Sequence, residues 1–453
     1  MTNKIPVYVV SGGVSKFAKA RIDKTFQGLA KEAYDYTLKD IGLEHARAVE
    51  LIDGLVTSYF SDHFTNQLMA GIMVQDYLGM CPKPGHRVEG GGATGGICFQ
   101  EAWKAVASGY MDICLAVGFE TMSRVNTWKG NEFIALASDT QFDFPVGGFY
   151  SGYYAMMVAR HMKEFGTKLN QLSMVAIKNR KNAIYNPFAQ NPGDYDIEDI
   201  QKAQMVAWPL TYLDICTMSD GAAAVLLASE DGLRKIEKAV GKAMSKIRVT
   251  GIGRGTDMMR MADRPHYDVI LMPHERKEDY IGSRFVDGKL QYPGIHSFRA
   301  GRSASIQAYK MAGVGNPLDD IDFIELHDAY SSSEIQTYED MGLCKYGEGG
   351  DFVESGYTFM DGVDYKFEST KGIKLKYKGK LPVNPSGGLI ACGHPVGATG
   401  LMQAVFALWQ LQGTIDKHFK DNKLQVKNAK RGAIHSHAGT GTYVTVSILE
   451  KEN

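Results

Sequence analysis

The feature that most constrains the fold of this chain is an internal repeat. Residues 91–106 read GGATGGICFQEAWKAV and residues 396–411 read VGATGLMQAVFALWQL, so a Gly-Ala-Thr-Gly sequence opens an apolar helix in both places. Aligning the two Ala-Thr-Gly triplets places Gly92 opposite Gly397. Three further segments match in the same order, namely 7–13 with 247–253, 55–62 with 324–331, and 113–120 with the stretch that begins at Gly432. Recurrence of four segments in one order predicts two halves of one topology, joined near residue 240.

The pattern within each half is typical of an α/β protein. Short runs of β-branched residues alternate with amphipathic stretches, which predicts buried strands covered by helices. Residues 121–208 differ, because they are rich in aromatic residues, Met and Gly and lack strong strand alternation. They are predicted to form a long excursion between core elements, a usual place for a substrate-binding lid. The aromatic stretch 148–159 within it suits the core of that excursion and the wall of a substrate pocket equally well.

Composition excludes several classes of protein. A chain of 453 residues suits two or three domains, and its formal net charge of -1 argues against a nucleic-acid binder. The six cysteines are scattered without a CxxC pair or a Cys/His ligand spacing, so neither a disulfide framework nor a metal site is expected in this chain. The N-terminal residues read as a first strand without a signal-peptide core, and no apolar run reaches membrane-spanning length. A cytoplasmic protein with no membrane partner is expected.

The glycine-rich stretch before the first repeated helix raises a chemical question. Residues 87–96 read RVEGGGATGG, a way to bring bare backbone N–H groups up to a ligand at a helix N-terminus. The tip, Gly91-Gly92, offers no side chain for chemistry. The spacing is not the GxGxxG of a dinucleotide-binding loop, and no acidic residue follows at the right distance. A dinucleotide-binding loop is therefore not expected here, and backbone N–H groups at a helix N-terminus suit an anion or an oxygen that carries negative charge.

Histidines stand in three segments where the repeat predicts strand ends and turns into helices. His327 lies in ELHDAYSS, His394 in NPSGGLIACGHPVGATG, and His435 is followed two residues later by His437 in AIHSHAGTGT. Strand ends are the expected ligand sites of open α/β sheets. Because Pro395 fixes the backbone after His394 and glycines flank the turn, that imidazole is aimed rather than mobile.

These three segments together resemble the thiolase superfamily, closest to its sterol-carrier-protein-type and archaeal-type branch. The resemblance spans essentially the whole chain, and the GHPxGATG motif makes it specific. It implies two tandem βαβαβαββ halves in a five-layered αβαβα arrangement, with a loop domain inserted in the first half. It also implies coenzyme A as substrate or product, a homodimer, and a small zinc-ribbon/OB-fold subunit as partner. An acyl group of the benzoylsuccinyl type is one expectation for the substrate.

The domain boundaries that follow from the resemblance are these. The N-terminal half takes residues 1–123 and 209–242, the loop domain takes residues 124–208, and the C-terminal half takes residues 243–453. Residues 357–382 form an insertion before the GHP segment. They contain two alternating runs around a Lys-Gly pair, which predicts a hairpin.

Site roles follow from the resemblance position by position. The GHP histidine falls on His394, which in thiolases activates the nucleophilic cysteine. The histidine of the HDCF motif falls on His327, an expected oxyanion-hole donor. The histidine of the C-terminal loop falls on His435, with Gly439 and Gly441 shaping the backbone. In the family's nucleophile elbow the cysteine position falls on Gly92.

Two departures accompany this match. The nucleophile position is Gly92, and the cysteine of the HDCF motif is replaced by Ala329. The absent side chain at residue 92 is expected to leave an intact oxyanion hole with open space beside it. Cys98 suits the helix core, and Cys392, two residues before His394, suits either a surrogate thiol or a small buried side chain.

Three functions remain open from the sequence. The first is a thiolase-type acyl-CoA C-acyltransferase that cleaves or forms a C–C bond β to a coenzyme A thioester. The second is a retro-aldol lyase of the same fold acting on a β-hydroxyacyl-CoA, which needs only a base and an oxyanion hole. The third is a noncatalytic subunit that binds coenzyme A or a partner.

Overall fold

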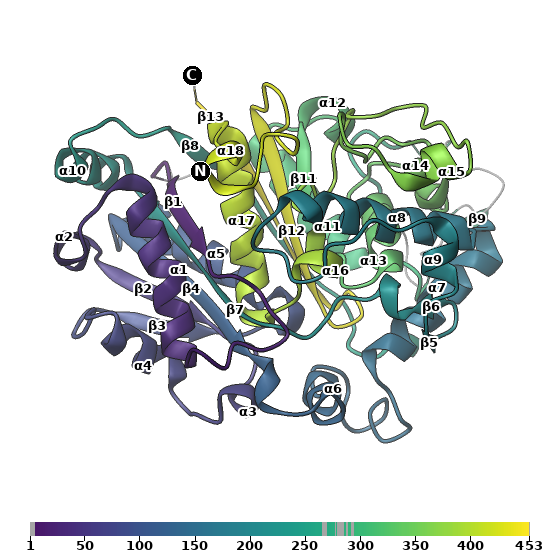
Figure 1. Ribbon diagram of the computed structural model, residues 1–453, viewed down its shortest axis with the longest axis horizontal. Coiled ribbons are helices and arrows are strands. Elements are labelled where there is room, and N and C mark those ends of the chain that lie inside the picture. Colours follow the sequence, from purple (N-terminus) through teal and green to yellow (C-terminus); the bar gives the residue numbers. More distant parts are fainter. Residues whose placement is uncertain are drawn as a thin grey trace.

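One mixed sheet forms the frame of the molecule (Figure 1). The computed structural model describes residues 5–264, 270–276, 278, 285–286, 289–290 and 294–452. The sheet order is β11-β12-β13-β8-β1-β7-β4-β2-β3. The strands are β1 (Tyr8–Val14), β2 (Gly54–Ser58), β3 (Gly85–Val88), β4 (Ile113–Thr121), β7 (Asp220–Ala228), β8 (Ile247–Thr256), β11 (Phe323–Glu325), β12 (Arg431–Ala438) and β13 (Tyr443–Lys451).

The repeat is visible in this order. The N-terminal half runs β1-β7-β4-β2 and the C-terminal half runs β8-β13-β12-β11, so corresponding strands hold corresponding places. The parallel pairs have the same register, because Leu55 pairs with Leu115 and its counterpart Ile324 pairs with Ala433. Continued along the strands, this register sets Phe119 opposite His437 and Glu120 opposite Ala438 in the repeat, one residue away from the sequence match that begins with Ile113 opposite Gly432. The halves meet where β1 pairs with β8.

Two helices that carry the repeated glycine motif form the middle layer (Figure 1). They are α5 (Thr94–Ala107), preceded by the 3₁₀ turn η1 (Gly91–Ala93), and α17 (Val396–Gln412). They cross at glycines, since a Cβ added to Gly95 would lie 2.6 Å from the Gly400 nitrogen. This close approach explains why both helices begin with small residues.

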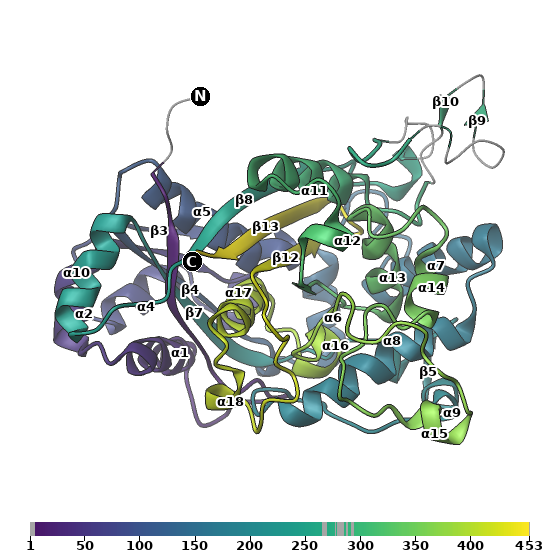
Figure 2. The ribbon, with the colours of Figure 1, turned by 90° about the horizontal axis from the view of Figure 1, so that it is seen from above.

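Helices also cover the outer faces of the sheet. On the N-terminal half α1 (Phe26–Ile41) packs on β1 and β7, and on the C-terminal half α11 (Arg299–Ala312) runs along β8 and β13 (Figure 2). The α1 helix begins at Thr25, whose side chain accepts a hydrogen bond from the Gly28 nitrogen, and ends at Gly42 in the left-handed conformation. The five layers expected for the thiolase fold are therefore present.

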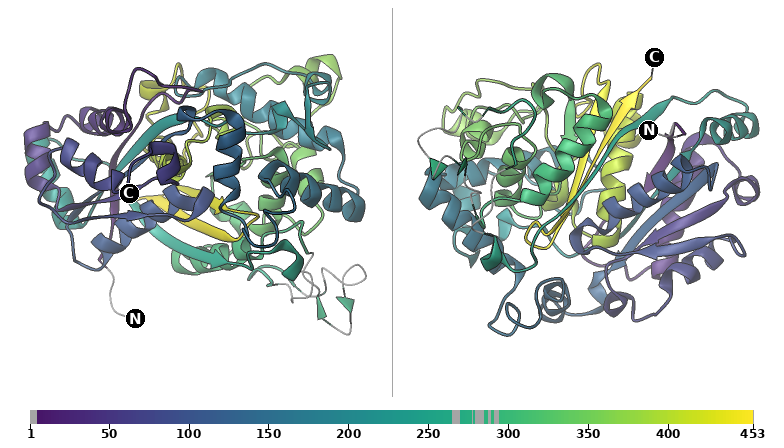
Figure 3. Two further views of the ribbon diagram at one scale, coloured as in Figure 1. Left: turned by 90° about the horizontal axis from the view of Figure 1, so that it is seen from below. Right: turned by 180° about the vertical axis from the view of Figure 1, so that it is seen from behind.

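The excursion between β4 and β7 is mainly helical. Its elements are α6 (Thr127–Ala135), α7 (Tyr150–Phe165), α8 (Leu169–Asn182), α9 (Ile197–Gln201), β5 (Met205–Ala207) and β6 (Leu210–Thr211). Helix α8 contacts three helices of the C-terminal half, α13 (Ser331–Asp340), α14 (Gly349–Glu354) and α16 (Gly388–Cys392). Figure 3 shows this blue segment reaching across to the green helices. The excursion thus lies over the end of the sheet at which β11 and β12 terminate.

The hairpin predicted near residues 357–382 does not form strands. Helix α15 (Lys366–Thr370) occupies its middle, and only isolated backbone bonds, such as Leu381 N–H to Tyr357 O at 3.0 Å, link the two sides. The reason is burial, because Phe359, Tyr365 and Phe367 all turn inward and are at most 1% exposed. Alternation in the sequence therefore reflected a small aromatic core and not a two-sided strand pair.

The remaining elements are short. They are α2 (His45–Leu51), α3 (Asp62–Thr65), α4 (Ala70–Tyr77), α10 (Glu230–Val240), α12 (Pro317–Asp320), α18 (Ile415–His418), β9 (Phe285–Val286) and β10 (Lys289–Leu290). Among the described residues, none of the helices combines the length and the apolar character needed to cross a membrane.

Candidate active site

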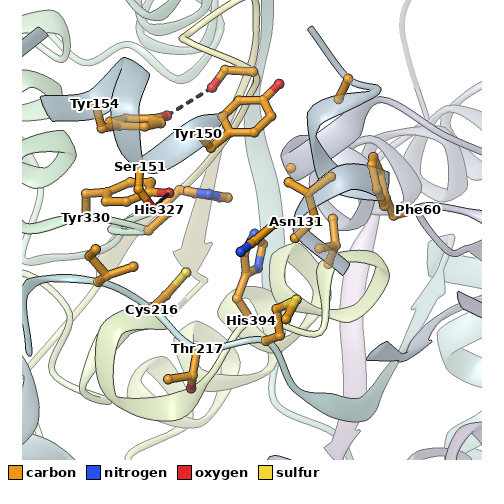
Figure 4. A pocket seen from close by; sticks show the side chains of 18 of the residues that line it. Phe60, Asn131, Tyr150, Ser151, Tyr154, Cys216, Thr217, His327, Tyr330 and His394 are labelled. Carbon is orange, nitrogen blue, oxygen red and sulfur yellow. Dashed lines mark hydrogen bonds between the residues drawn. The ribbon is translucent and has the colours of Figure 1, made fainter. Parts of the chain in front are cut away.

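A cavity of about 130 Å³ lies where the strand ends of the C-terminal half face the α5 elbow and the helices α6 and α7 (Figure 4). It is lined by three histidines, four aromatic side chains and small or neutral residues, with no Lys, Arg, Asp or Glu among the described lining residues. The lining residues used below are Gly92, Tyr150, Ser151, Tyr154, Cys216, Thr217, His327, Ala329, Tyr330, His394, His437 and Gly439.

His327 follows strand β11 and is 3% exposed. The next residue, Asp328, fixes this strand end, because its carboxylate accepts the Leu389 N–H at 2.6 Å and so ties it to α16. The His327 ring lies 4.9 Å from the His394 ring and 4.2 Å from the His437 ring, measured between centroids. Burial, together with the neighbouring histidines, holds the pKa of His327 well below its usual value. The imidazole is therefore neutral at physiological pH and able to donate one N–H.

His394 stands on the turn between α16 and α17. Gly393, with φ of 104°, makes the turn, and the His394 N–H donates to the Thr217 carbonyl at 3.1 Å. The His394 Nδ1 lies 3.2 Å from the Thr399 hydroxyl, which itself donates to the Val396 carbonyl. That hydroxyl oxygen can then accept from Nδ1–H, which leaves Nε2 with a lone pair. Burial lowers the pKa of His394 to about 3, so the ring is a neutral proton acceptor.

The structure distinguishes the two histidines of β12. His437 lines the cavity, and its Nε2 lies 2.6 Å from the Tyr154 hydroxyl, which donates to the Gly439 carbonyl. His435 is not a lining residue, and neither of its ring nitrogens has a hydrogen-bond partner within the described part of the chain. The two ring centroids are 5.6 Å apart. Sequence reasoning selected His435, whereas the geometry places His437 at the cavity; its position at the strand end, next to the glycine loop, was the available signal.

The backbone turn at Gly92 leaves no room for a side chain. A Cβ added there would lie 2.5 Å from the His437 carbonyl oxygen and 3.2 Å from His327 Cε1. The expectation of open space beside Gly92 is therefore wrong, because the end of β12 fills it. Gly92 still lines the cavity at the start of η1, and the preceding turn is held by Glu89, whose carboxylate accepts the Gly91 N–H at 2.5 Å.

The other predicted residues fall into two groups. Gly439 lines the cavity with φ of 61°, a backbone conformation that glycine adopts without strain. Cys392 ends α16, is fully buried, donates to the Ser386 carbonyl and does not line the cavity. Burial raises its pKa well above the usual value. Cys98 is likewise buried in α5.

Several lining residues were not singled out from the sequence. Tyr154 of α7 stacks on Tyr330 with centroids 4.2 Å apart, and the Tyr330 hydroxyl lies 3.3 Å from that of Ser151. Cys216 lies on the segment before β7, and its N–H donates to the Ala329 carbonyl at 2.9 Å. The one sequence signal for these lining residues was the aromatic content of residues 148–159. No three His, Cys, Asp or Glu side chains of the described residues gather where they could hold a metal ion.

Comparison with family descriptions gives two matches. Residues 7–200 match the thiolase N-terminal domain, and residues 290–363 and 366–451 match the thiolase C-terminal domain-like family.

Similar proteins extend over nearly the full chain. An acetyl-CoA acetyltransferase of Methanothermobacter thermautotrophicus is 33% identical over 98% of this chain and 99% of its own. Benzoylsuccinyl-CoA thiolase subunit BbsB of Thauera aromatica is 29% identical over 90% of this chain and 89% of its own. Among solved structures, the Ltp2-ChsH2(DUF35) aldolase superposes with a TM-score of 0.71 at 23% identity, covering 100% of this chain and 99% of that one.

Proposed function

Because this chain belongs to the thiolase family, we propose that it is an acyl-CoA C-acyltransferase that cleaves or forms the C–C bond β to a coenzyme A thioester. The observation that carries the proposal is the convergence of His327, His394 and His437 on one cavity opposite the Gly92 elbow. Strands and turns from distant parts of the sequence deliver these side chains to one place, which a noncatalytic scaffold does not need.

In thiolysis, the thiol of coenzyme A must lose a proton and attack the β-keto carbonyl. Nε2 of His394, which carries the lone pair, takes this proton. His327 donates an N–H to the thioester oxygen as negative charge moves onto it, assisted by the N-terminus of η1 and α5 at Gly92. His437, which is hydrogen-bonded to Tyr154, forms another wall of the cavity, and the ring of His435 lies next to the ring of His437.

Without a cysteine at residue 92, attack proceeds on noncovalently bound substrate. The C–C bond breaks, its electron pair enters the thioester enolate, and the β-carbonyl carbon leaves bonded to the incoming sulfur. The enolate then takes one proton, so that two acyl-CoA molecules form from one β-ketoacyl-CoA and one coenzyme A. This chain-shortening step is of the kind that β-oxidation requires.

The residues that line the cavity indicate which acyl group the substrate carries. Phe60, Tyr150, Tyr154 and Tyr330 offer aromatic and apolar surface, and no described lining residue carries a charge. A bulky aromatic β-ketoacyl group fits this surface. A free carboxylate, as in a benzoylsuccinyl group, has no cation to meet it there. Benzoylacetyl-CoA is therefore expected to be cleaved with a higher kcat/KM than benzoylsuccinyl-CoA, and the reverse order would show that the charge is recognised elsewhere.

A retro-aldol lyase is the second candidate, favoured by the same elbow. Because a side chain at residue 92 would collide with the His437 carbonyl, the site is built for chemistry without an acyl-enzyme. A base that removes the proton of a β-hydroxyl and an oxyanion hole suffice for such cleavage. The Ltp2-ChsH2(DUF35) aldolase, which shares the fold, is an example of a lyase on this architecture.

Product analysis separates the two reactions. The protein is incubated with a β-ketoacyl-CoA plus coenzyme A, and separately with the matching β-hydroxyacyl-CoA. Thiolysis consumes free coenzyme A in the first reaction, whereas retro-aldol cleavage releases an aldehyde or ketone in the second without consuming it. Radiolabelled acyl-CoA should leave no label on the denatured protein. A stable acyl-enzyme on Cys392 would overturn the noncovalent route.

Assembly is the last part of the proposal. We expect a homodimer and a small zinc-ribbon/OB-fold subunit, acting together in the cytoplasm on coenzyme A thioesters. The described chain leaves the β3 edge of the sheet unpaired, with Leu68 and Met69 nearby about 70% exposed, at 72% and 69%. Purification of this chain alone with full activity would remove the need for a second polypeptide, and light scattering would give the mass of the assembly.

A further inference from the structure

A cysteine that the sequence did not point to stands inside the cavity. The segment that leads into β7 runs antiparallel to the end of β11, with Ile215 bridged to Tyr330. Continued by one residue, this register sets Cys216 directly opposite Ala329, as the bond from Cys216 N–H to Ala329 O at 2.9 Å requires. Opposite residues of an antiparallel pair project from the same face. Both residues accordingly line the cavity.

The sulfur of Cys216 points into this space toward the histidines (Figure 4). His327, which is 3% exposed, lines the same space, and its Nδ1 has no hydrogen-bond partner within the part of the chain that the structure describes. A buried imidazole left in this state indicates a place prepared for a polar ligand. Cys98, Cys114 and Cys392 differ, because they are fully buried and none of them lines the cavity.

Two of the other hydroxyl groups at the cavity are already engaged, and a third, that of Tyr150, has no partner among the described residues but points away from the histidines (Figure 4). The Tyr154 hydroxyl donates to the Gly439 carbonyl, and the Tyr330 hydroxyl pairs with Ser151. The Nδ1–H of His394 is directed at Thr399. Either reaction considered above ends with a thioester enolate whose α-carbon needs a proton, and the thiol of Cys216 is the candidate donor that points toward the histidines.

We propose that Cys216 is a catalytic acid that delivers this proton to the α-carbon of the departing acyl-CoA, an inference that rests on the proposed function. When the C–C bond breaks, its electron pair enters the enolate and the Cys216 S–H proton moves to the α-carbon. The resulting thiolate recovers a proton from the His394 imidazolium. His394 in turn received its proton from the coenzyme A thiol in thiolysis, or from the β-hydroxyl in retro-aldol cleavage, so both reactions balance.

The environment of the thiol agrees with this role. Burial raises the pKa of Cys216 to about 12, so the group carries its proton throughout the neutral range and is a poor target for alkylation. An acid must be protonated before the step in which it acts, and this residue meets that condition without a partner base.

Hydrogen exchange at the α-carbon tests the proposal independently of C–C cleavage. Acetyl-CoA and propionyl-CoA are incubated with the protein in D₂O, and deuterium at the α-carbon is followed by mass spectrometry. The wild-type protein should exchange it, and Cys216→Ala should lose about 100-fold or more of that rate. Acetyl-CoA affinity and the melting temperature, measured in parallel, should change little. Cys344→Ala, a half-buried cysteine away from the cavity, is the matched control.

A second variant places a cysteine on the opposite side of the strand pair. Because Ala329 faces Cys216 across the pair, Cys216→Ala combined with Ala329→Cys should regain part of the exchange. Exchange that persists in Cys216→Ala, or that is absent from the wild-type protein, would overturn the proposal. If the wild-type protein exchanges in a Cys216-dependent way but cleaves no β-ketoacyl-CoA or β-hydroxyacyl-CoA, the proposed function fails, and only proton transfer between Cys216 and the α-carbon of an acyl-CoA stands.

Discussion

The two halves of the molecule each build a niche at the start of a central helix, and only one of the two niches is open. In the first, the end of β12 faces the start of η1 and α5, where Gly92 approaches the His437 carbonyl. In the second, the end of β4 faces the start of α17, where a Cβ on Gly397 would lie 2.5 Å from the Phe119 carbonyl. The backbone arrangement is the same in both, as the repeat predicts.

The side chains make the difference between them. In the niche at α17, Glu120 is fully buried and accepts the N–H groups of Phe60 and Gly397, at 2.8 and 3.0 Å. Ser58 completes the seal by donating to the Gly397 carbonyl at 2.7 Å. In the niche at α5 the counterparts of Glu120 and Ser58 are Ala438 and His327. A carboxyl group that accepts backbone N–H groups is thus replaced by a methyl group, and the hydroxyl that donates to the Gly397 carbonyl is replaced by an imidazole. Duplication supplied two sites, and only one of them can accept a ligand.

The largest expected effect comes from truncating His327, and it is compared with truncation of its counterpart Ser58. His327→Ala should lower kcat/KM by about 100- to 1,000-fold, as expected for a lost oxyanion donor. Ser58→Ala should leave kcat/KM nearly unchanged and cost about 1 kcal/mol of unfolding free energy through one lost hydrogen bond. Steady-state kinetics and denaturant titration of both variants decide the matter. Equal losses of activity would show that the α17 niche also takes part in the reaction.

A smaller effect is expected at the paired glycines. Gly92→Ala and Gly397→Ala should each destabilise the protein by about 1–3 kcal/mol, because each new Cβ meets a strand-end carbonyl. Gly315→Ala is the control, since the nearest atom to its Cβ is Asp320 Oδ2 at 3.6 Å. Gly92→Cys should likewise lose stability and gain no acyl-enzyme. A Gly92→Cys protein that is stable and becomes labelled by acyl-CoA would show that the elbow can reopen.

His435, the one of the two buried histidines of β12 that does not line the cavity, should make the C-terminal half sensitive to acid. Burial lowers the pKa of His435 to about 3, whereas the unfolded chain protonates near 6.5. Between these values the unfolded state binds the extra proton, so stability falls as pH decreases, by about 1.4 kcal/mol per pH unit for one such group. Its counterpart in the first half is Val117. His435→Val should reduce the slope by about 1.4 kcal/mol per pH unit, as measured by denaturant titrations from pH 7 to pH 4, because the buried histidines of the cavity, whose pKa values are also lowered, keep their own contributions.

The smallest effect is expected at Glu120. Burial raises the pKa of this carboxyl to about 8, so at pH 7 it is mostly protonated and resembles an amide. Glu120→Gln should therefore change activity at pH 7 by less than about twofold. Since the folded pKa lies above that of the unfolded chain, the contribution of Glu120 to stability is full below pH 4.5 and declines as pH rises toward 8. Relative to the wild-type protein, the unfolding free energy of Glu120→Gln should therefore rise as pH increases over that range. A difference in unfolding free energy that does not change with pH would contradict the raised pKa of Glu120.

Much of this site could be predicted from the sequence, and some of it could not. The GHP turn placed His394, because a glycine and a proline fix its backbone whatever surrounds it. His327 followed from its place after a strand. The choice between His435 and His437 depended on which of two residues on one strand face reaches the cavity, and that is set by how far β12 extends past β11. Cys216 was hidden because it becomes part of the site only through pairing with a segment more than a hundred residues away.

The sequence by itself determined the duplicated α/β topology, the central pair of helices and the glycine that opens each of them. These follow from local periodicity and from repeated small residues, which act on the nearest few positions of the chain. Only the tertiary structure decided that the His437 carbonyl fills the space beside Gly92, that Glu120 seals the second niche, and that Cys216 stands opposite Ala329. Each of these is a contact between atoms distant in sequence, and its presence depends on the register and reach of whole strands, which no local pattern specifies.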